Sequence, residues 1–285
     1  QKNSIYFTTG HGELDINDSD RRKEEGIGLI KERMEAQNMK VDAVNLAQKE
    51  IPKDASLLVI AGPKTPFFPE EVQKVKDYLS GGGRLIAMID PGPEMREEAT
   101  TGLEPLLAEY NVQVKDNLVI DLAANFRSPA RLLVPVGGTR TSHSIVEDLK
   151  GEQILMEQVR EVAPLTPTPP PGQPAGAPAS PFKTDTLLST RDGSLVSGDP
   201  VSWGESSYKS RDRKVKFDEG EDSKGPISLA LAVSKNEGAG PDPHAGMMGG
   251  PPPQQKSTPV MVVFGDSSFA ANNWVSQVPT NRDLF

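Results

Sequence analysis

The chain has 285 residues, which is enough to bury a sizeable core, and carries a formal net charge of −9. This acidity argues against nucleic acid or an anionic membrane surface as the main partner. The chain has no cysteine, which excludes disulfides, thiolate metal sites and cysteine nucleophiles.

The first part of the chain is predicted to alternate strands with helices. Residues Ile5–Thr8 are a short β-prone run, and Ile27, Ile30 and Met34 follow helical spacing after a polar stretch that can cap a helix. A second β-prone run follows at Val41–Leu46. The elements therefore begin in the order β-α-β.

The segment Leu57–Pro91 has the pattern of a βαβ unit. Its first apolar run, Leu57–Ile60, is continuous, as in a strand that is buried on both faces. A helix with Pro69 in its first turn follows, and Gly81–Gly83 let the chain leave it and return as the strand Arg84–Ile89. Because these glycines precede a strand and not a helix, we interpret them as a helix stop and not as a phosphate-binding loop.

The link between the second strand and this unit is too short for a crossover helix. One solution is a sheet that continues on both sides of the first strand, with a switch point between Thr8-Thr9 and Ala61-Gly62. Open α/β sheets bind ligands beyond the carboxyl ends of their strands at such a point. We therefore predict a ligand or partner crevice there, called the strand-end crevice below, formed by Thr8, Thr9, Gly10, His11, Glu13, Gly62, Pro63, Lys64, Asp90, Pro91, Asp266 and Ser267.

Beyond Pro91 the alternation is weaker. A helix is expected at Leu103–Tyr110, and one or two helical turns at Ser144–Leu149. The expected strands are Val112–Val114, Leu118–Ile120, Arg131–Val136, Gln153–Val162, Leu187–Thr190, Ile227–Val233 and Val260–Phe264, of which the last is apolar throughout and therefore central. The side chains expected to be buried in the central sheet are Leu58, Ile60, Ile86, Met88, Val262 and Phe264.

Two stretches rich in proline and glycine divide the chain. Because 164–181 and 238–259 lack periodic apolar residues, we predict that both are surface loops. The other expected units are an α/β core domain at 1–136, a strand and helix extension at 137–163 and a β-rich segment at 182–237. Residues 260–285 should begin with the closing strand of the sheet.

The predicted crevice offers few groups for catalysis. Ser267 follows a strand but lacks the G-x-S-x-G spacing of a nucleophile elbow, and His11 is the one nearby histidine. The side chains of His11, Glu13, Asp90 and Asp266 could converge on a divalent cation, although turn formation also explains the two aspartates. We expect no cofactor, no metal and no enzymatic activity. A carbohydrate-binding or amidotransferase-like hydrolytic domain is the alternative if the four side chains converge.

Several segments together resemble a known family. IYFTTGHGELD, DASLLVIAGPKTPFFPEEVQKVKDYLSGGGRLIAMIDP, GPISLALAV, VMVVFGDSSFAANNW and NRDLF occur in this order between Ile5 and Phe285. They are similar to the GldG-like auxiliary domain of uncharacterised ABC-type transport systems, a domain also present in intraflagellar transport proteins. The resemblance implies an α/β fold with a flavodoxin-like or class I glutamine amidotransferase-like parallel sheet, here with an additional β-rich C-terminal part. In that family NRDLF opens a helix that leads towards the membrane, so the resemblance implies that 260–285 also include the start of a membrane-proximal helix. The resemblance transfers no catalytic residue.

The resemblance also implies a role and a place in the cell. Proteins of this kind are extracytoplasmic, are tethered by membrane helices, act with an ABC permease and ATPase, and are implicated in gliding motility or export. We therefore expect a non-enzymatic domain for assembly or for substrate or partner binding, as a homodimer or heterodimer, on the periplasmic face of the bacterial envelope. Gln1 is not an initiator methionine and no apolar run reaches the ~18 residues of a membrane span, so we expect a piece of a longer protein whose membrane helices lie outside it.

Overall fold

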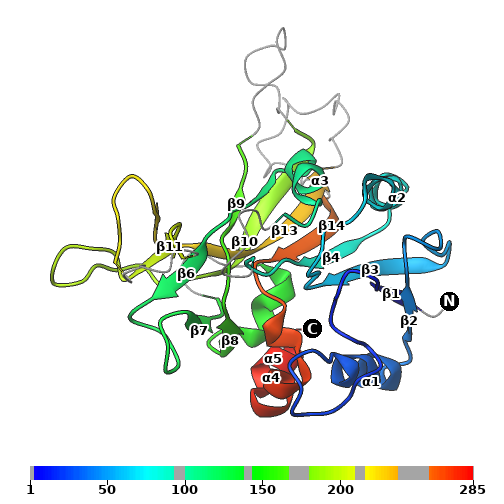
Figure 1. Ribbon diagram of the computed structural model, residues 1–285, viewed down its shortest axis with the longest axis horizontal. Helices are drawn as coiled ribbons and strands as arrows, with labels where there is room; N and C mark the ends of the chain where they lie inside the picture. The colour runs from blue at the N-terminus through cyan, green and yellow to red at the C-terminus, as the bar shows by residue number, and fades with distance from the viewer. Residues whose placement is uncertain are drawn as a thin grey trace, which may run out of the picture.

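A seven-stranded sheet forms the centre of the computed structural model, which describes residues 3–92, 100–137, 143–166, 180–208, 216–236 and 257–284 (Figure 1). The strands lie in the order β10-β13-β14-β4-β3-β1-β2. All neighbours from β14 to β2 are parallel, and β13 is antiparallel to both of its neighbours. The strand bounds are β1 Ser4–Thr8, β2 Lys40–Val44, β3 Ala55–Ala61, β4 Leu85–Met88, β10 Phe182–Ser189, β13 Ser228–Asn236 and β14 Ser257–Phe264.

The sheet extends on both sides of β1, as the short link between the second strand and the βαβ unit predicted. Thr8 of β1 pairs with Val44 of β2, and Phe7 pairs with Val59 of β3 on the other side. The closing strand β14 lies between β4 and β13, so its predicted central position is confirmed. Strands β10 and β13 come from the region expected as a β-rich segment, and they continue the same sheet.

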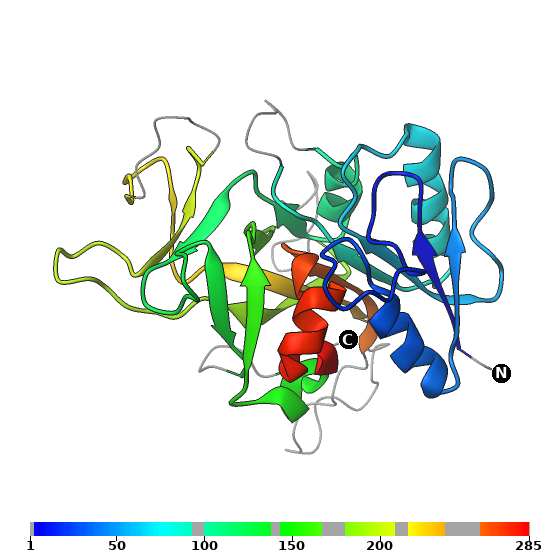
Figure 2. The ribbon, with the colours of Figure 1, turned by 60° about the horizontal axis from the view of Figure 1, so that its bottom comes forward.

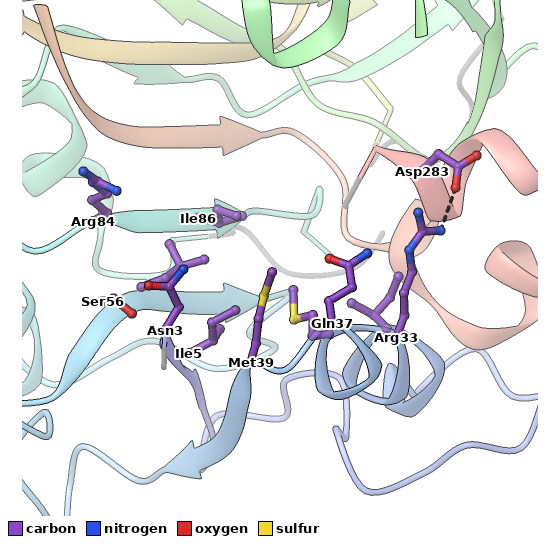
Figure 3. A pocket seen from close by; sticks show the side chains of 12 residues that line it. Asn3, Ile5, Arg33, Gln37, Met39, Ser56, Arg84, Ile86 and Asp283 are labelled. Atoms are coloured by element: carbon purple, nitrogen blue, oxygen red, sulfur yellow. Dashed lines mark hydrogen bonds and ion pairs between the residues drawn. The ribbon is translucent and has the colours of Figure 1, made fainter. Parts of the chain in front are cut away.

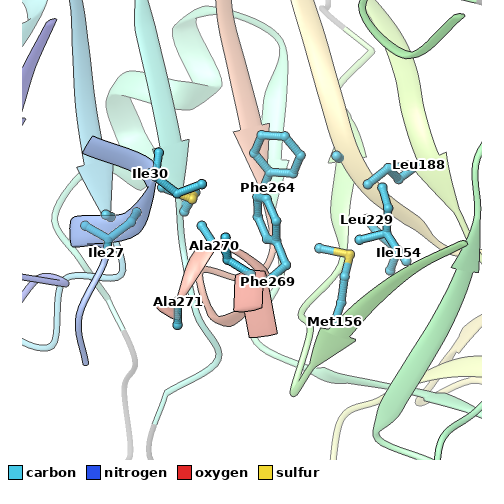
Figure 4. Packing of buried hydrophobic residues seen from close by; sticks show 14 of the residues in the cluster. Ile27, Ile30, Ile154, Met156, Leu188, Leu229, Phe264, Phe269, Ala270 and Ala271 are labelled. Carbon is cyan, nitrogen blue, oxygen red and sulfur yellow. The ribbon is translucent and has the colours of Figure 1, made fainter. Parts of the chain in front are cut away.

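Helices cover both faces of the sheet, because successive residues of each buried strand point to opposite sides. One face packs against α1 (Gly28–Ala36) and α4 (Asn272–Gln277), which lie side by side with α5 (Pro279–Asp283) next to them (Figure 2). The core on this face includes Phe264 and Phe269, whose ring centroids are 4.9 Å apart (Figure 4). The other face packs against α2 (Pro69–Ser80) and α3 (Glu104–Glu109). The protein is thus a three-layer α/β structure.

Smaller antiparallel sheets flank the central one. Strand β5 (Val112–Val114) pairs with β9 (Val162–Pro164), and β7 (Arg131–Pro135) pairs with β8 (Gln153–Glu157). Strand β6 (Leu118–Asp121) pairs with β11 (Ser202–Glu205), which also pairs with β12 (Ser223–Lys224). Short 3-10 helices occupy Ser144–Leu149 and Ser268–Ala270. In the described part of the chain, no helix is long and apolar enough to cross a bilayer.

The structure corrects several expectations about the strands. Residues Gln153–Val162 do not form one strand, because Gln158 has φ 58° and turns the chain between β8 and β9. Two of the six side chains expected to be buried, Ile86 and Val262, are only half-buried, because the helices of the described residues cover only partly the sheet face to which they point.

The ends of the two predicted loops also differ. Pro164 belongs to β9, and Ser257–Pro259 belong to β14. Proline is tolerated at Pro259 because this part of β14 pairs only with β13, and pairing with β4 begins at Met261. Most of 164–181 and 238–259, namely 167–179 and 238–256, lies outside the described residues.

Candidate functional site

The carboxyl ends of β1, β3, β4 and β14 place the predicted crevice residues along one edge of the sheet. Ala61 at the end of β3 pairs with Met88 of β4, and Met88 also pairs with Phe264 of β14. The loops after these strands are therefore neighbours, as parallel pairing requires. Their polar side chains form two clusters, one around His11 and one around Asp90.

In the first cluster, the His11 imidazole lies between two glutamates. Its Nε2 is 3.0 Å from Oε2 of Glu71, and its Nδ1 is 3.8 Å from Oε1 of Glu13. The ring stacks on Phe67 with centroids 4.1 Å apart. All three ionisable side chains are almost fully buried. Such a cluster is costly to bury unless its charges are paired, so it fixes how the loop after β1 meets α2.

Backbone geometry holds His11 in this position. Gly10 and Gly12 have φ of 117° and 79°, a region that glycine adopts readily, and they turn the loop back on itself. The carbonyl oxygen of His11 accepts N–H bonds from Lys64 (2.7 Å) and Thr65 (3.0 Å). The backbone N–H of His11 donates to Oε2 of Glu13 at 2.7 Å. The loops after β1 and β3 are thereby joined.

Sequence reasoning missed the role of Glu71. It lies in the first turn of α2. Its Oε2 accepts the backbone N–H of Phe68 at 2.8 Å, as the glutamate of a capping box does, and the same oxygen faces His11. The capping spacing is visible in the sequence, but the pairing across 60 residues with His11 is not.

In the second cluster, the Asp90 carboxylate connects two loops. Its Oδ1 accepts the backbone N–H of Ser267 at 2.6 Å, and its Oδ2 accepts the Ser267 hydroxyl at 2.9 Å. The same Oδ2 lies 2.5 Å from Nζ of Lys64, whose side chain is largely exposed. Gly62, with φ 66°, approaches both Asp90 and Ser267 so closely that a Cβ there would collide with them. The loops after β3, β4 and β14 are therefore linked through one carboxylate.

Asp266 is buried beside this cluster. Its carboxylate accepts N–H bonds from Ser268 (2.8 Å), Phe269 (3.3 Å) and Glu157 (3.3 Å). Burial, followed by the neighbouring charge of Asp90, raises the pKa of Asp266 to about 8 in spite of these donors. Asp266 thus ties the loop after β14 to β8.

A buried arginine that sequence reasoning missed completes this region. Arg160 is 2% exposed, and its guanidinium donates to the carbonyl oxygens of Lys115 (2.6 Å) and Asp90 (3.3 Å). Desolvation lowers the pKa of Arg160 from its ordinary value. The residues around Arg160 have the pattern of a single strand. The sequence therefore gave no signal that its guanidinium is buried against two carbonyl oxygens.

The remaining crevice residues contribute mostly backbone to the strand ends. Thr8 is buried in β1, the N–H of Thr9 donates to Val44, Pro63 is buried and Pro91 is half-buried. His11 and Glu13 lie in one cluster, and Asp90 and Asp266 lie in the other. Within the described ranges, no three His, Asp or Glu side chains are arranged to hold a metal ion.

A cavity of about 440 Å³ lies at the opposite ends of the strands. It is on the α1 face, beside the amino ends of β1, β3 and β4, and none of the predicted crevice residues lines it (Figure 3). This second site is called the α1-face groove below.

Comparison with known proteins agrees with this fold. A family model described as an ABC-type uncharacterized transport system matches residues 2–284. The intraflagellar transport protein 52 homolog of Mus musculus is 34% identical over 64 residues, which make up 22% of this chain and 15% of that protein. The match thus spans a small part of this relative.

Two solved structures share the fold at low sequence identity. The mmIFT52 N-terminal domain is 15% identical with a TM-score of 0.59, over 98% of this chain and 92% of that one. A putative ThuA-like protein from Bacteroides uniformis is 10% identical with a TM-score of 0.50, over 99% and 87%. The class I glutamine amidotransferase-like sheet expected from the sequence is confirmed.

Proposed function

Since the chain belongs to the family of ABC-type uncharacterized transport systems, we propose that it is a non-catalytic auxiliary domain that acts in complex assembly or in partner binding. This proposal is supported by one observation: the side chains at the strand ends form hydrogen bonds and ion pairs with one another. His11 faces Glu71, and Asp90 is held by Ser267 and Lys64. Side chains used in this way hold loops together, and so shape a surface for recognition.

The geometry of Ser267 also favours binding over hydrolysis. A serine nucleophile needs a general base within hydrogen-bond reach. The Ser267 hydroxyl donates to Asp90, and the imidazole of His11 faces Glu71 instead. Asp90 is itself occupied by Lys64 and by the backbone N–H of Ser267. The arrangement therefore supports a structural role for this serine.

The proposal also covers the location of the domain in the cell and its partner proteins. We propose that the domain lies on the extracytoplasmic face of a bacterial envelope, is anchored by membrane segments outside these residues, and belongs to a complex with the permease and ATPase of its transport system. A role in gliding motility or export, as a homodimer or heterodimer, follows the resemblance of its segments to GldG-like domains.

Co-purification tests the assembly role. The full-length protein should co-purify with its own permease and ATPase from detergent-solubilised membranes, and a topology reporter fused to this domain should be active only outside the cytoplasm. Failure to recover either transport subunit under conditions that keep permease and ATPase together would contradict the proposal.

An activity assay tests the proposal that the domain is not an enzyme. The purified domain should hydrolyse amide, ester and phosphate substrates no faster than the buffer does. Hydrolysis that disappears in His11→Ala or Asp90→Ala would establish the hydrolytic alternative, provided that both variants remain folded at the assay temperature.

A further inference from the structure

Several apolar side chains on the α1 face of the sheet are only partly covered by the helices of the described residues. Ile5 of β1 pairs in register with Leu57 of β3, and Ile86 of β4 pairs with Val262 of β14. Leu57, Ile86 and Val262 are only half-buried. The next residues along the same strands point to the α2 face, where Leu58 is fully buried. The difference between the two faces is therefore one of helix coverage and not of strand composition.

Three of these residues, Ile5, Leu57 and Ile86, form the floor of the α1-face groove. The cavity of about 440 Å³ is lined by Ile5, Leu57 and Ile86 from the strands and by Ile30 and Met34 from α1. Polar side chains stand at its margins, including Gln37 at the end of α1 (Figure 3). An apolar floor with polar margins is the arrangement that receives one face of an amphipathic helix.

The charges of the groove differ in sign from those of the chain as a whole. The chain carries −9, whereas the groove is lined by two arginines, Arg33 and Arg84, and one aspartate, Asp283. Arg33 is paired with Asp283 at 2.6 Å. Arg84 is exposed, and within the described residues its guanidinium has no hydrogen-bond or ion-pair partner. A partner with a carboxylate at this position would therefore be complementary to the groove.

We propose that the α1-face groove binds an amphipathic helix of a partner protein, with its apolar stripe on Leu57 and Ile86 and an acidic side chain paired with Arg84. Ile5 and Leu57 are in register, whereas Ile86 lies one strand further and two residues along, since it pairs with Val59. The three floor side chains therefore span two inter-strand distances across the sheet and two residues along it, or ~12 Å. This is the length of a helix of ~8 residues. The same position on the opposite face is covered by a helix of this chain, α2.

A labelled synthetic peptide can test this directly. The probe is a 15-residue helix with leucines at i, i+3, i+4, i+7 and i+11 and glutamates beside that stripe, and a second peptide carries lysines in place of the glutamates. With the 285-residue chain, fluorescence anisotropy should show saturable binding of the glutamate peptide. Arg84→Glu should weaken its binding at least ~10-fold and should improve binding of the lysine peptide. Ile86→Ser should weaken binding of both peptides.

Matched controls make the outcome decisive. Arg22→Glu changes another exposed arginine, which lies away from the groove, and should leave both affinities unchanged. The proposal is overturned by equal affinity of wild type and Arg84→Glu, by no saturation at millimolar peptide, or by binding of dodecanoate where neither peptide binds. It is also overturned by a dimer of the chain that Ile86→Ser dissociates, since the groove would then hold a second copy. These measurements do not depend on the transport role, so either proposal can fail without the other.

Discussion

The imidazole of His11, in the loop after β1, lies 3.0 Å from the carboxylate of Glu71 in the first turn of α2. Both side chains are almost fully buried, and the same carboxylate oxygen caps the helix at Phe68. One side chain thus fixes both the start of α2 and the position of the loop that carries the predicted crevice. Removing one partner would leave the other buried without its counterpart.

Glu71→Ala should lower the free energy of unfolding by about 2–4 kcal/mol, because it removes a helix cap and leaves His11 without its partner. Glu70→Ala is the matched control, since Glu70 is exposed in the same turn and its removal should cost less than about 0.5 kcal/mol. Urea unfolding of the two variants measures the difference. Equal costs would mean that the His11–Glu71 contact contributes nothing.

The pKa of Asp266, which burial raises to about 8, predicts a pH dependence of stability. Between pH values of about 4 and 8, the folded chain keeps this proton while the unfolded chain releases it. The free energy of unfolding should therefore fall as pH rises through this window, by at most about 1.4 kcal/mol per pH unit from this group.

Asp266→Asn isolates this contribution because an amide does not titrate. Between pH 5.5 and 8.5, the wild type should lose stability relative to Asp266→Asn, as followed by urea unfolding. Asp77→Asn, at an exposed helix position, should keep the wild-type dependence. A wild-type slope that persists in Asp266→Asn would show that another group is responsible.

Truncation of two isoleucines should separate the covered from the uncovered face of the sheet. Ile60 is fully buried, so Ile60→Ala should cost about 2–5 kcal/mol through lost burial and the remaining cavity. Ile86→Ala should cost clearly less, because Ile86 is half-exposed at the groove floor. Chemical denaturation gives both values. A larger cost for Ile86→Ala would indicate that the groove is closed in solution.

The two proline-rich stretches should be dispensable for folding. Replacing 167–179 or 238–256 by a short Gly-Ser linker should change the melting temperature by only a few degrees, because neither stretch has periodic apolar residues. A replacement that also removes Ser257–Pro259 should lower it further, since these residues pair with β13. Calorimetry of the three variants distinguishes these cases. Loss of the folded state in either of the first two variants would refute the assignment of these stretches as surface loops.

Local patterns predicted much of the central sheet. The βαβ unit from β3 through α2 to β4 was recognisable because its apolar runs, the proline at its helix start and the glycines after the helix are all encoded within about 35 neighbouring residues. The position of β1 between two parallel neighbours followed from a link too short for a helix. The break at Gln158 was missed, because a single residue with positive φ leaves the apolar pattern on either side intact.

The sequence by itself determined which segments become strands and helices and which loops lie at the strand ends, because those properties depend on neighbouring residues. Only the tertiary structure decided that Glu71 meets His11, that Arg160 reaches the carbonyl oxygen of Asp90, and that Ile86 and Val262 remain half-buried. Such contacts depend on which elements pack together across long sequence separations. The sequence shows that Ile86 is apolar. Its exposure depends on whether a helix covers it, and the helices of the described residues cover it only partly.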